Sequence, residues 1–224
     1  MDMDRKMFER IEPNEWFQNF RWFESTEGFK VACAKSAAEN MLLLDRYGEP
    51  NDLVFYADIP SSRFVLVKPI RGQVTEQTRK QAAEFAAANS EAWNRNFTHV
   101  DVYSTTKAQI KKSTDPTKAF GSASFIIYGK REVYKNVDVR LAIGVRLTEG
   151  EKTPKVVCAP ASAARHNAHF FVTLKPGMKS VPEIATTIKN KIFLKAGDRY
   201  RVYVEKIKED MLYEYIPNNM VEIS

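Results

Sequence analysis

The side chains of this sequence that could do chemistry are mainly basic, and several stand next to aromatic residues, as in Arg21-Trp22 and Arg63-Phe64. Single-stranded nucleic acid is commonly held by a cationic groove with aromatic faces on which bases stack. The pattern therefore predicts a phosphate-binding set: Arg21, Lys68, Arg71, Lys111, Lys112, Lys130 and Arg131. The alternative is that Trp22 and Phe64 pack in the core while the lysines only solvate the surface.

One acidic residue stands at a point where it could be functional. Asp58 ends an apolar run and precedes a turn with the sequence Ile59-Pro60-Ser61-Ser62. It could act as a general base or orient a basic side chain such as Arg63. An Asp at the start of a turn more often bonds backbone N–H groups. We treat Asp58 and Arg63 as a candidate functional turn.

The motifs of the common catalytic and metal sites are missing from the sequence. It has no Gly-rich phosphate loop and no G-x-S-x-G motif. His166 and His169 are three residues apart with no third ligand nearby, and Cys33 and Cys158 lie far apart in apolar stretches. We therefore expect no catalytic residues, no metal, no cofactor and no enzymatic activity. The cysteines should be core residues.

Composition describes a folded, basic chain. Its 224 residues are 44% hydrophobic and 28% charged, with a net charge of +6. Such a charge favours a polyanionic partner, because cations that neutralise phosphates release counterions. No apolar run reaches the length of a membrane span, and residues 1–15 do not read as a signal peptide. We expect a cytoplasmic protein with no membrane partner.

The first half of the chain predicts strands with two helices between them. Aromatic and β-branched runs on either side of Thr26-Glu27-Gly28 predict a hairpin. Ser36 and Glu39 form a capping box for a helix that should end near Gly48. Residues 52–58 and 63–68 read as strands, and residues 75–94 as a helix.

The second half adds alternating segments and further helices. Residues 139–147 alternate strictly and predict a strand with one buried face and one face open to water or a ligand. A short Ala-rich helix is expected around residues 161–166. A longer helix should begin at Ser180 and end at Gly197. Residues 198–207 alternate again and predict a last strand.

Together these elements predict an α+β fold, with a mostly antiparallel mixed sheet and helices packed on it. We expect a single domain with a C-terminal appendage. Its parts are an N-terminal extension (1–15), a main domain (16–194) and a C-terminal strand and tail (195–224).

The segment NFRWFESTEGFKVACAKSAAEN resembles the opening of the NFACT RNA-binding (NFACT-R) domain family. DLVFYADIPSSRFVLVKP resembles the strand, turn and strand that follow in that family, and SASFIIYGKRE resembles its G-S-F-x-I-x-G-K-K segment. ARHNAHFFVTLKPGMKS is similar to the part that comes next in archaeal-type members. The resemblance covers residues 16–194 and is most specific in its first block.

The resemblance implies an RNA-binding module of the stand-alone type, for tRNA or ribosomal RNA, with ribosome association and translation quality control as its setting. Two positions depart from the family pattern. Tyr56 and Pro60 stand where the family often has histidines on either side of the aspartate, which puts histidine-dependent chemistry at that turn in doubt. The sequence leaves the oligomeric state open.

Two other functions remain as alternatives. One is an enzyme that modifies or processes RNA, with Asp58 and Lys68 beside a pocket. The other is a scaffold that binds a protein through the alternating C-terminal strands, which would require an exposed apolar patch of several hundred Å2.

Overall fold

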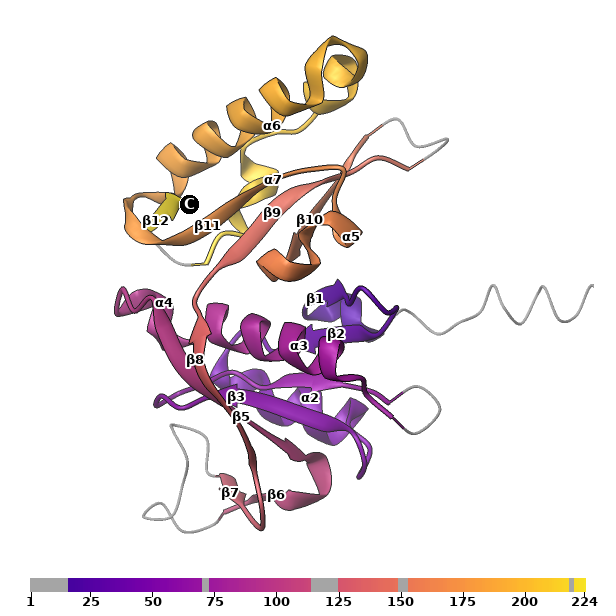
Figure 1. The fold of residues 1–224 in the computed structure, drawn as a ribbon, viewed down its shortest axis with the longest axis vertical. Helices are drawn as coiled ribbons and strands as arrows, with labels where there is room; N and C mark the ends of the chain where they lie inside the picture. The colour runs from indigo at the N-terminus through magenta and orange to yellow at the C-terminus, as the bar shows by residue number, and fades with distance from the viewer. Residues whose placement is uncertain (1–15, 70–72, 114–124, 149–152, 218–219) are drawn as a thin grey trace, which may run out of the picture.

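The protein has an α+β architecture, as predicted, with two larger antiparallel sheets (Figure 1). The computed structural model describes residues 16–69, 73–113, 125–148, 153–217 and 220–224. The predicted N-terminal extension (1–15) and Arg71 therefore lie outside the described residues.

The first sheet is antiparallel and has the strand order β1-β2-β4-β3-β5-β8. The expected hairpin is present, with Gly28 at a φ of +87°, a value that side chains disfavour. Its strands are β1 (Arg21–Glu24), β2 (Lys30–Cys33), β3 (Leu53–Ala57), β4 (Val65–Val67), β5 (His99–Thr106) and β8 (Glu132–Asp138).

Both faces of this sheet are covered, each by different elements. One face packs on α3 (Glu76–Ala88), with α4 (Glu91–Asn94) after it. The predicted helix 75–94 is thus two helices, because the chain leaves helical geometry at Ser90, whose side chain caps α4. The other face buries a separate cluster that includes residues of the 3-10 helix η1 (Trp16–Asn19) and of α2 (Asn40–Tyr47).

A small two-stranded sheet covers the edge of that second cluster. It pairs β6 (Ile110–Lys112) with β7 (Phe125–Ile127), and its inward residues Ile110 and Phe125 are buried. The segment between the two strands lies outside the described residues. The hairpin places Lys111 and Lys112 on the surface next to the first sheet.

The second sheet has the order β10-β9-β11-β12 and is followed along one side by the longest helix (Figure 1). That helix begins directly after Ser180, as predicted, with a capping box in which the Ser180 amide donates to Glu183 Oε2 at 2.9 Å. The elements are β9 (Leu141–Arg146), β10 (Lys155–Ala159), α5 (Ala164–Asn167), β11 (Phe170–Lys179), α6 (Val181–Val204), α7 (Asp210–Tyr213) and β12 (Val221–Ile223).

The strand predicted for residues 198–207 is wrong, because α6 continues through Val204. Gly197 does interrupt the helix, with φ of 61° and ψ of −177°, but helical geometry resumes after it. Tyr200, Val204 and Ile207 recur at helical spacing, and the last two are buried. Over so few residues the sequence fits both the two-residue period of a strand and the 3.6-residue period of a helix. Packing against the second sheet stabilises the helix.

The open face predicted for residues 139–147 is also wrong. β9 is the central neighbour of β10 and β11, and α5 and α6 both contact it, so Leu141 through Val145 are buried on both faces. At Gly144 an added Cβ would lie 2.3 Å from the Phe170 carbonyl oxygen. The small residues of the alternating pattern therefore permit close packing and do not face water.

One hydrophobic core joins the two sheets. It contains Phe55 and Phe85 from the first sheet and α3, together with Ile143 and Ile188 from the second sheet and α6. The expected domain boundary between residues 194 and 195 falls inside α6, and buried side chains follow it as far as Val221.

Candidate nucleic-acid interface

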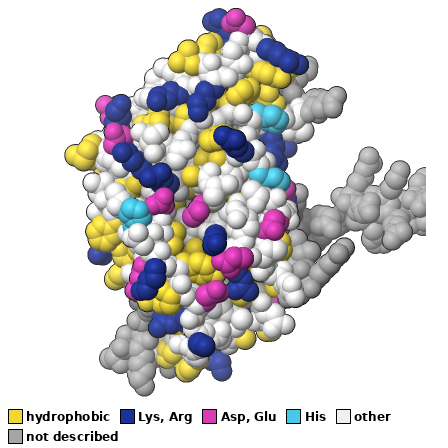
Figure 2. Space-filling view, viewed as in Figure 1, with side chains coloured by type: hydrophobic (Ala, Val, Ile, Leu, Met, Phe, Trp, Pro, Cys, Tyr) yellow, Lys and Arg dark blue, Asp and Glu magenta, His cyan; other side chains and the backbone are white. Residues whose placement is uncertain are grey.

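Four of the predicted cations lie together at the β6–β7 end of the molecule. Lys111 and Lys112 are on β6, and Lys130 and Arg131 are in the turn from β7 to β8. All four are exposed. Figure 2 shows Lys and Arg side chains at this lower end of the molecule. We call these four residues the hairpin cluster.

Two cations of the hairpin cluster are placed over tyrosine rings. Lys111 Nζ lies 5.8 Å from the centre of the Tyr128 ring, and the Arg131 guanidinium carbon lies 4.7 Å from that of Tyr103. Such cation–π contacts orient a cation without neutralising it. Tyr128 is 51% exposed, so its ring is also open to a stacked base.

The turn that carries Lys130 and Arg131 is held by the side chain of Gln109. Gln109 Nε2 donates to the carbonyl oxygens of Tyr128 at 2.7 Å and Lys130 at 3.0 Å. Its Oε1 accepts from the Thr106 amide at 3.0 Å. Between the two carbonyls, Gly129 has a φ of +77°. This turn therefore needs an amide side chain at position 109 and a glycine at position 129.

The candidate turn at Asp58 joins the same cluster. Tyr103 Oη donates to Asp58 Oδ2 at 3.3 Å, and Arg131 Nη1 donates to Tyr56 Oη at 3.3 Å. Burial raises the pKa of the Tyr56 hydroxyl, and the Arg131 hydrogen bond offsets only part of that effect. Tyr56 is therefore a neutral anchor for Arg131 at the position where the family pattern often has a histidine.

The backbone contacts expected of the Asp58 carboxylate are made by a neighbouring side chain. Within the turn, Ser62 Oγ accepts from the Ala57 amide at 2.9 Å. The carboxylate of Asp58 is exposed and points to Tyr103. Asp58 therefore adds a negative charge near Arg131 and orients the Tyr103 ring beneath it.

The other predicted cations lie elsewhere. Lys68 is at the opposite end of β3 and β4 from Asp58, about 20 Å along the strand. It pairs with Asp52 at 3.0 Å and Glu49 at 3.4 Å. Arg21 donates to Asn89 at the end of α3, at 2.9 Å. Arg63 is partly buried, and burial lowers the pKa of its guanidinium. Lys68 and Asp58 thus do not share a site.

The core alternative holds fully for one of the two aromatic side chains and only in part for the other. Phe64 is buried, whereas Trp22 is only partly buried. Cys33 and Cys158 are both buried, and burial raises the pKa of their thiols to about 11 and about 12. Neither thiol is reactive at neutral pH. Among the described residues there is no cluster of three or more His, Cys, Asp or Glu that could hold a metal ion.

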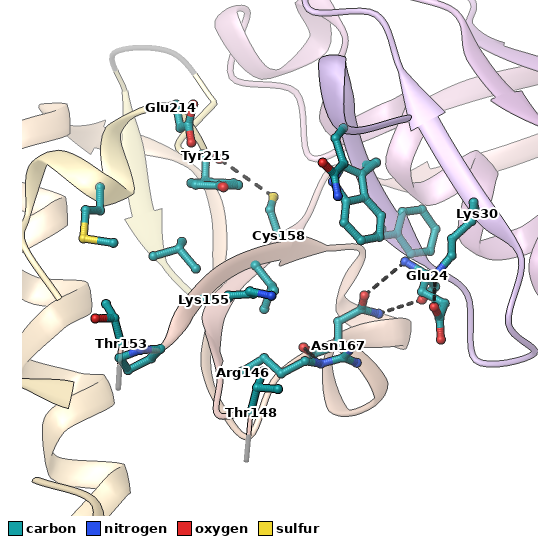
Figure 3. Close-up of a pocket in the computed structure, with 17 residues that line it drawn as sticks. Glu24, Lys30, Arg146, Thr148, Thr153, Lys155, Cys158, Asn167, Glu214 and Tyr215 are labelled. Carbon is teal, nitrogen blue, oxygen red and sulfur yellow. Dashed lines mark hydrogen bonds and ion pairs between the residues drawn. The ribbon is translucent and has the colours of Figure 1, made fainter. Parts of the chain in front are cut away.

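A cavity of about 870 Å3 lies where the two sheets meet, between β1 and β10 (Figure 3). Its wall includes Trp22, Lys30 and Lys155, and the carboxylate of Glu24. Glu24 binds Lys30 on one side and His166 Nε2, at 3.0 Å, on the other. Its backbone forms two hydrogen bonds with the Asn167 side chain. These contacts join β1 to α5, so Glu24 holds the two sheets together rather than serving as a free base.

Sequence reasoning missed the tyrosines and the glutamine of this interface. Tyr103 lies in β5 and Tyr128 follows β7, and neither stands directly next to the cation it supports. The available signal was the proximity of Gln109, Lys111 and Lys112 along the chain.

No helix among the described residues is long and apolar enough to cross a membrane.

Comparison with known proteins matches the chain to an RNA-binding domain family and to homologues of Rqc2 and NEMF. Residues 19–129 match the family described as NFACT protein RNA binding domain. Archaeal Rqc2 homolog aRqcH of Methanocaldococcus jannaschii is 29% identical over 175 residues, which are 78% of this chain and 26% of that protein. Ribosome quality control complex subunit NEMF homolog of Drosophila melanogaster is 26% identical over 131 residues, which are 58% of this chain and 13% of that protein.

Among solved structures, the C-terminal part of the fibronectin/fibrinogen-binding protein from Streptococcus suis aligns with 53% of this chain and 45% of that chain, at a TM-score of 0.45 and 20% identity. That likeness is too distant to carry an argument. The match to curated relatives spans about a quarter of their length or less. Lys111 and Lys112 lie near the C-terminal end of the family match, and Lys130 and Arg131 follow directly after it. The second sheet and α6 lie farther along the chain, beyond the match.

Proposed function

The chain belongs to the NFACT RNA-binding domain family through residues 19–129, and from this premise we propose that it binds tRNA or ribosomal RNA through the hairpin cluster. The setting we propose is ribosome-associated quality control in the cytoplasm, because the similar protein of Drosophila melanogaster is named as a ribosome quality control complex subunit. We further propose that the protein acts by binding and not by catalysis.

The observation that carries this proposal is the arrangement of charge and rings in the hairpin cluster. Lys111 and Arg131 lie over tyrosine rings, and no carboxylate among the described residues is within ion-pair distance of either cation. Their charge is therefore available to phosphates. An exposed Tyr128 ring next to them fits an unpaired base, which would give the site a preference for RNA with accessible bases.

The test is binding of purified protein to tRNA, a ribosomal RNA fragment and DNA, measured by fluorescence anisotropy at several salt concentrations. Charge reversal in the variant K111E/K112E should flatten the slope of log K against log salt by about 1.4 to 1.8 or more, because two phosphate contacts are lost. The matched control is K35E/K80E, which makes the same charge change at two exposed lysines outside the cluster.

A second variant separates stacking from charge. Tyr128→Ala should weaken RNA binding by about 1–3 kcal/mol for one lost base stack and leave the salt slope unchanged. Equal slopes for K111E/K112E and its control would contradict this placement of the site. Weak binding to all three nucleic acids that disappears at physiological salt would contradict the proposed function itself.

A further inference from the structure

The exposed side of α6, together with the short segment that follows it, carries a dense set of cations. Between residues 189 and 208 there are seven Lys and Arg residues against two acids, Asp198 and Glu205. Six of the seven are exposed, and Lys189 is partly buried. We call this set the helix surface: Lys189, Lys191, Lys195, Arg199, Arg201, Lys206 and Lys208.

Cations of the helix surface are interleaved with aromatic rings. Arg201 lies 4.9 Å from the ring centre of Phe193, Arg199 lies 5.2 Å from that of Tyr200, and Lys195 lies 5.4 Å from that of Phe171 on β11. Figure 2 shows Lys and Arg side chains alternating with hydrophobic ones over the upper part of the molecule, where α6 lies. This is the composition of a surface for nucleic acid.

The cations of the helix surface differ in whether a carboxylate lies close to them. Arg201 pairs with Glu205 at 3.1 Å. In the part of the chain that the structure describes, no carboxylate is within 4.0 Å of Lys191 or Arg199. Uncompensated like charges on adjacent turns repel one another, so a polyanion that binds there relieves the repulsion.

The apolar side of the helix is already occupied. Ile184, Ile188, Ile192 and Ala196 are buried against the second sheet. An amphipathic helix that binds membranes needs such a stripe free to enter the lipid. The exposed apolar residues Leu194 and Val202 stand among cations instead of forming a continuous face. The partner that fits is therefore nucleic acid.

We propose that the helix surface is a second RNA-binding site, which contacts the phosphate backbone and lies outside the region matched by the family. It is at the opposite end of the molecule from the hairpin cluster (Figure 1). The inference rests on the proposed function only for the identity of the ligand. The two sites use different residues and can be inactivated separately.

The experiment compares three double variants of the full chain on one structured RNA and on DNA over 50–300 mM salt. K191Q/R199Q removes two cations of the helix surface that have no carboxylate partner among the described residues. K111Q/K112Q removes two cations of the hairpin cluster, and K35Q/K80Q is the control with the same change in charge. Circular dichroism and thermal unfolding check that all three keep the wild-type fold.

K191Q/R199Q should flatten the salt slope for RNA by about 1.4 to 1.8 and raise Kd at physiological salt about tenfold or more, with the control unchanged. If K191Q/R199Q had the same salt slope as the control while K111Q/K112Q bound RNA more weakly, this inference would be overturned and the proposed function would stand. Absence of RNA binding by the wild-type protein would overturn both.

A vesicle assay tests the membrane as occupant. Sedimentation with phosphatidylcholine vesicles containing phosphatidylserine should leave the wild-type protein in the supernatant at physiological salt. Vesicle binding that K191Q/R199Q abolishes, together with an unchanged slope for RNA, would assign the helix surface to anionic lipid and overturn the proposal.

Discussion

At the β6–β7 end of the molecule Lys111 and Arg131 lie over tyrosine rings, and Arg131 is part of a hydrogen-bonded turn. Along α6, by contrast, the cations project from successive turns of one helix. Gln109 and Tyr56 fix the first group. In the second group Lys195 donates to the Phe171 carbonyl oxygen and Arg201 pairs with Glu205, whereas the placement of Lys191 follows from the docking of the helix through its isoleucine stripe. An ordered cation loses less conformational entropy on binding, so a contact at the hairpin cluster should contribute more than a contact of Lys191.

The two sheets that carry these surfaces are joined to each other. They share one hydrophobic core, and Trp93 Nε1 donates to the Met220 carbonyl oxygen at 3.1 Å, from α4 to the C-terminal segment. The two surfaces therefore differ in local construction but depend on the same folded unit. Variants can test the contact between the two sheets first and each surface separately afterwards.

The largest effect is expected at the junction. Trp93 is 1% exposed, and Trp93→Ala should lower the free energy of unfolding by about 3–5 kcal/mol, because it leaves a cavity in the shared core. Urea unfolding followed by circular dichroism and by tyrosine fluorescence should give one coincident transition. Two separate transitions would show that the sheets are independent units.

The next effect belongs to the second sheet alone. In Gly144→Ala the new Cβ would lie 2.3 Å from the Phe170 carbonyl oxygen and 2.6 Å from Phe171 Cβ, which should cost about 1–3 kcal/mol of stability. The decrease in the urea midpoint measures it. If the added methyl group had no effect on stability, the close packing of β9 between its neighbours would be wrong.

A smaller effect is expected at the hairpin cluster. Gln109→Ala removes the hydrogen bonds to the Tyr128 and Lys130 carbonyl oxygens, which should cost about 1–2 kcal/mol and raise Kd for RNA several-fold. Binding titrations at fixed salt measure the change, and Gln77→Ala on the exposed side of α3 is the control. Unchanged affinity would mean that the order of this turn does not matter for binding.

The smallest effect is a pH dependence at the contact between β1 and α5. Partial burial raises the pKa of the Glu24 carboxyl, but hydrogen bonds from Lys30 and His166 outweigh it and hold the pKa below its ordinary value of 4.5. Because the folded-state pKa is the lower one, these contacts stabilise the fold above pH 4.5, and the stabilisation is lost as the pH falls through the folded-state value.

Glu24→Gln should therefore lower stability by under about 1 kcal/mol at pH 6 and lose its difference from the wild type below the folded-state pKa. Urea midpoints at several pH values between 6 and 3 measure this convergence. A difference that stays constant over that range would assign no stabilisation to the charge of Glu24.

The sequence by itself determined most elements of the first sheet and the chemical character of the chain. Turn residues, capping boxes and period-two runs are local signals, so the hairpin at Gly28 and the helices that begin after Ser36 and Ser180 followed from residues close together. The family also followed, because its signature lies in one contiguous block at residues 19–40.

Only the tertiary structure decided which cations lie together and which faces are open. Lys68 and Arg21 are as basic as Lys111, but contacts with Asp52 and Asn89 engage them, and those partners are distant in sequence. Residues 198–207 fit a strand and a helix equally well until packing on the second sheet selected the helix and created its basic surface. Burial and charge pairing depend on long-range contacts, which a local pattern does not contain.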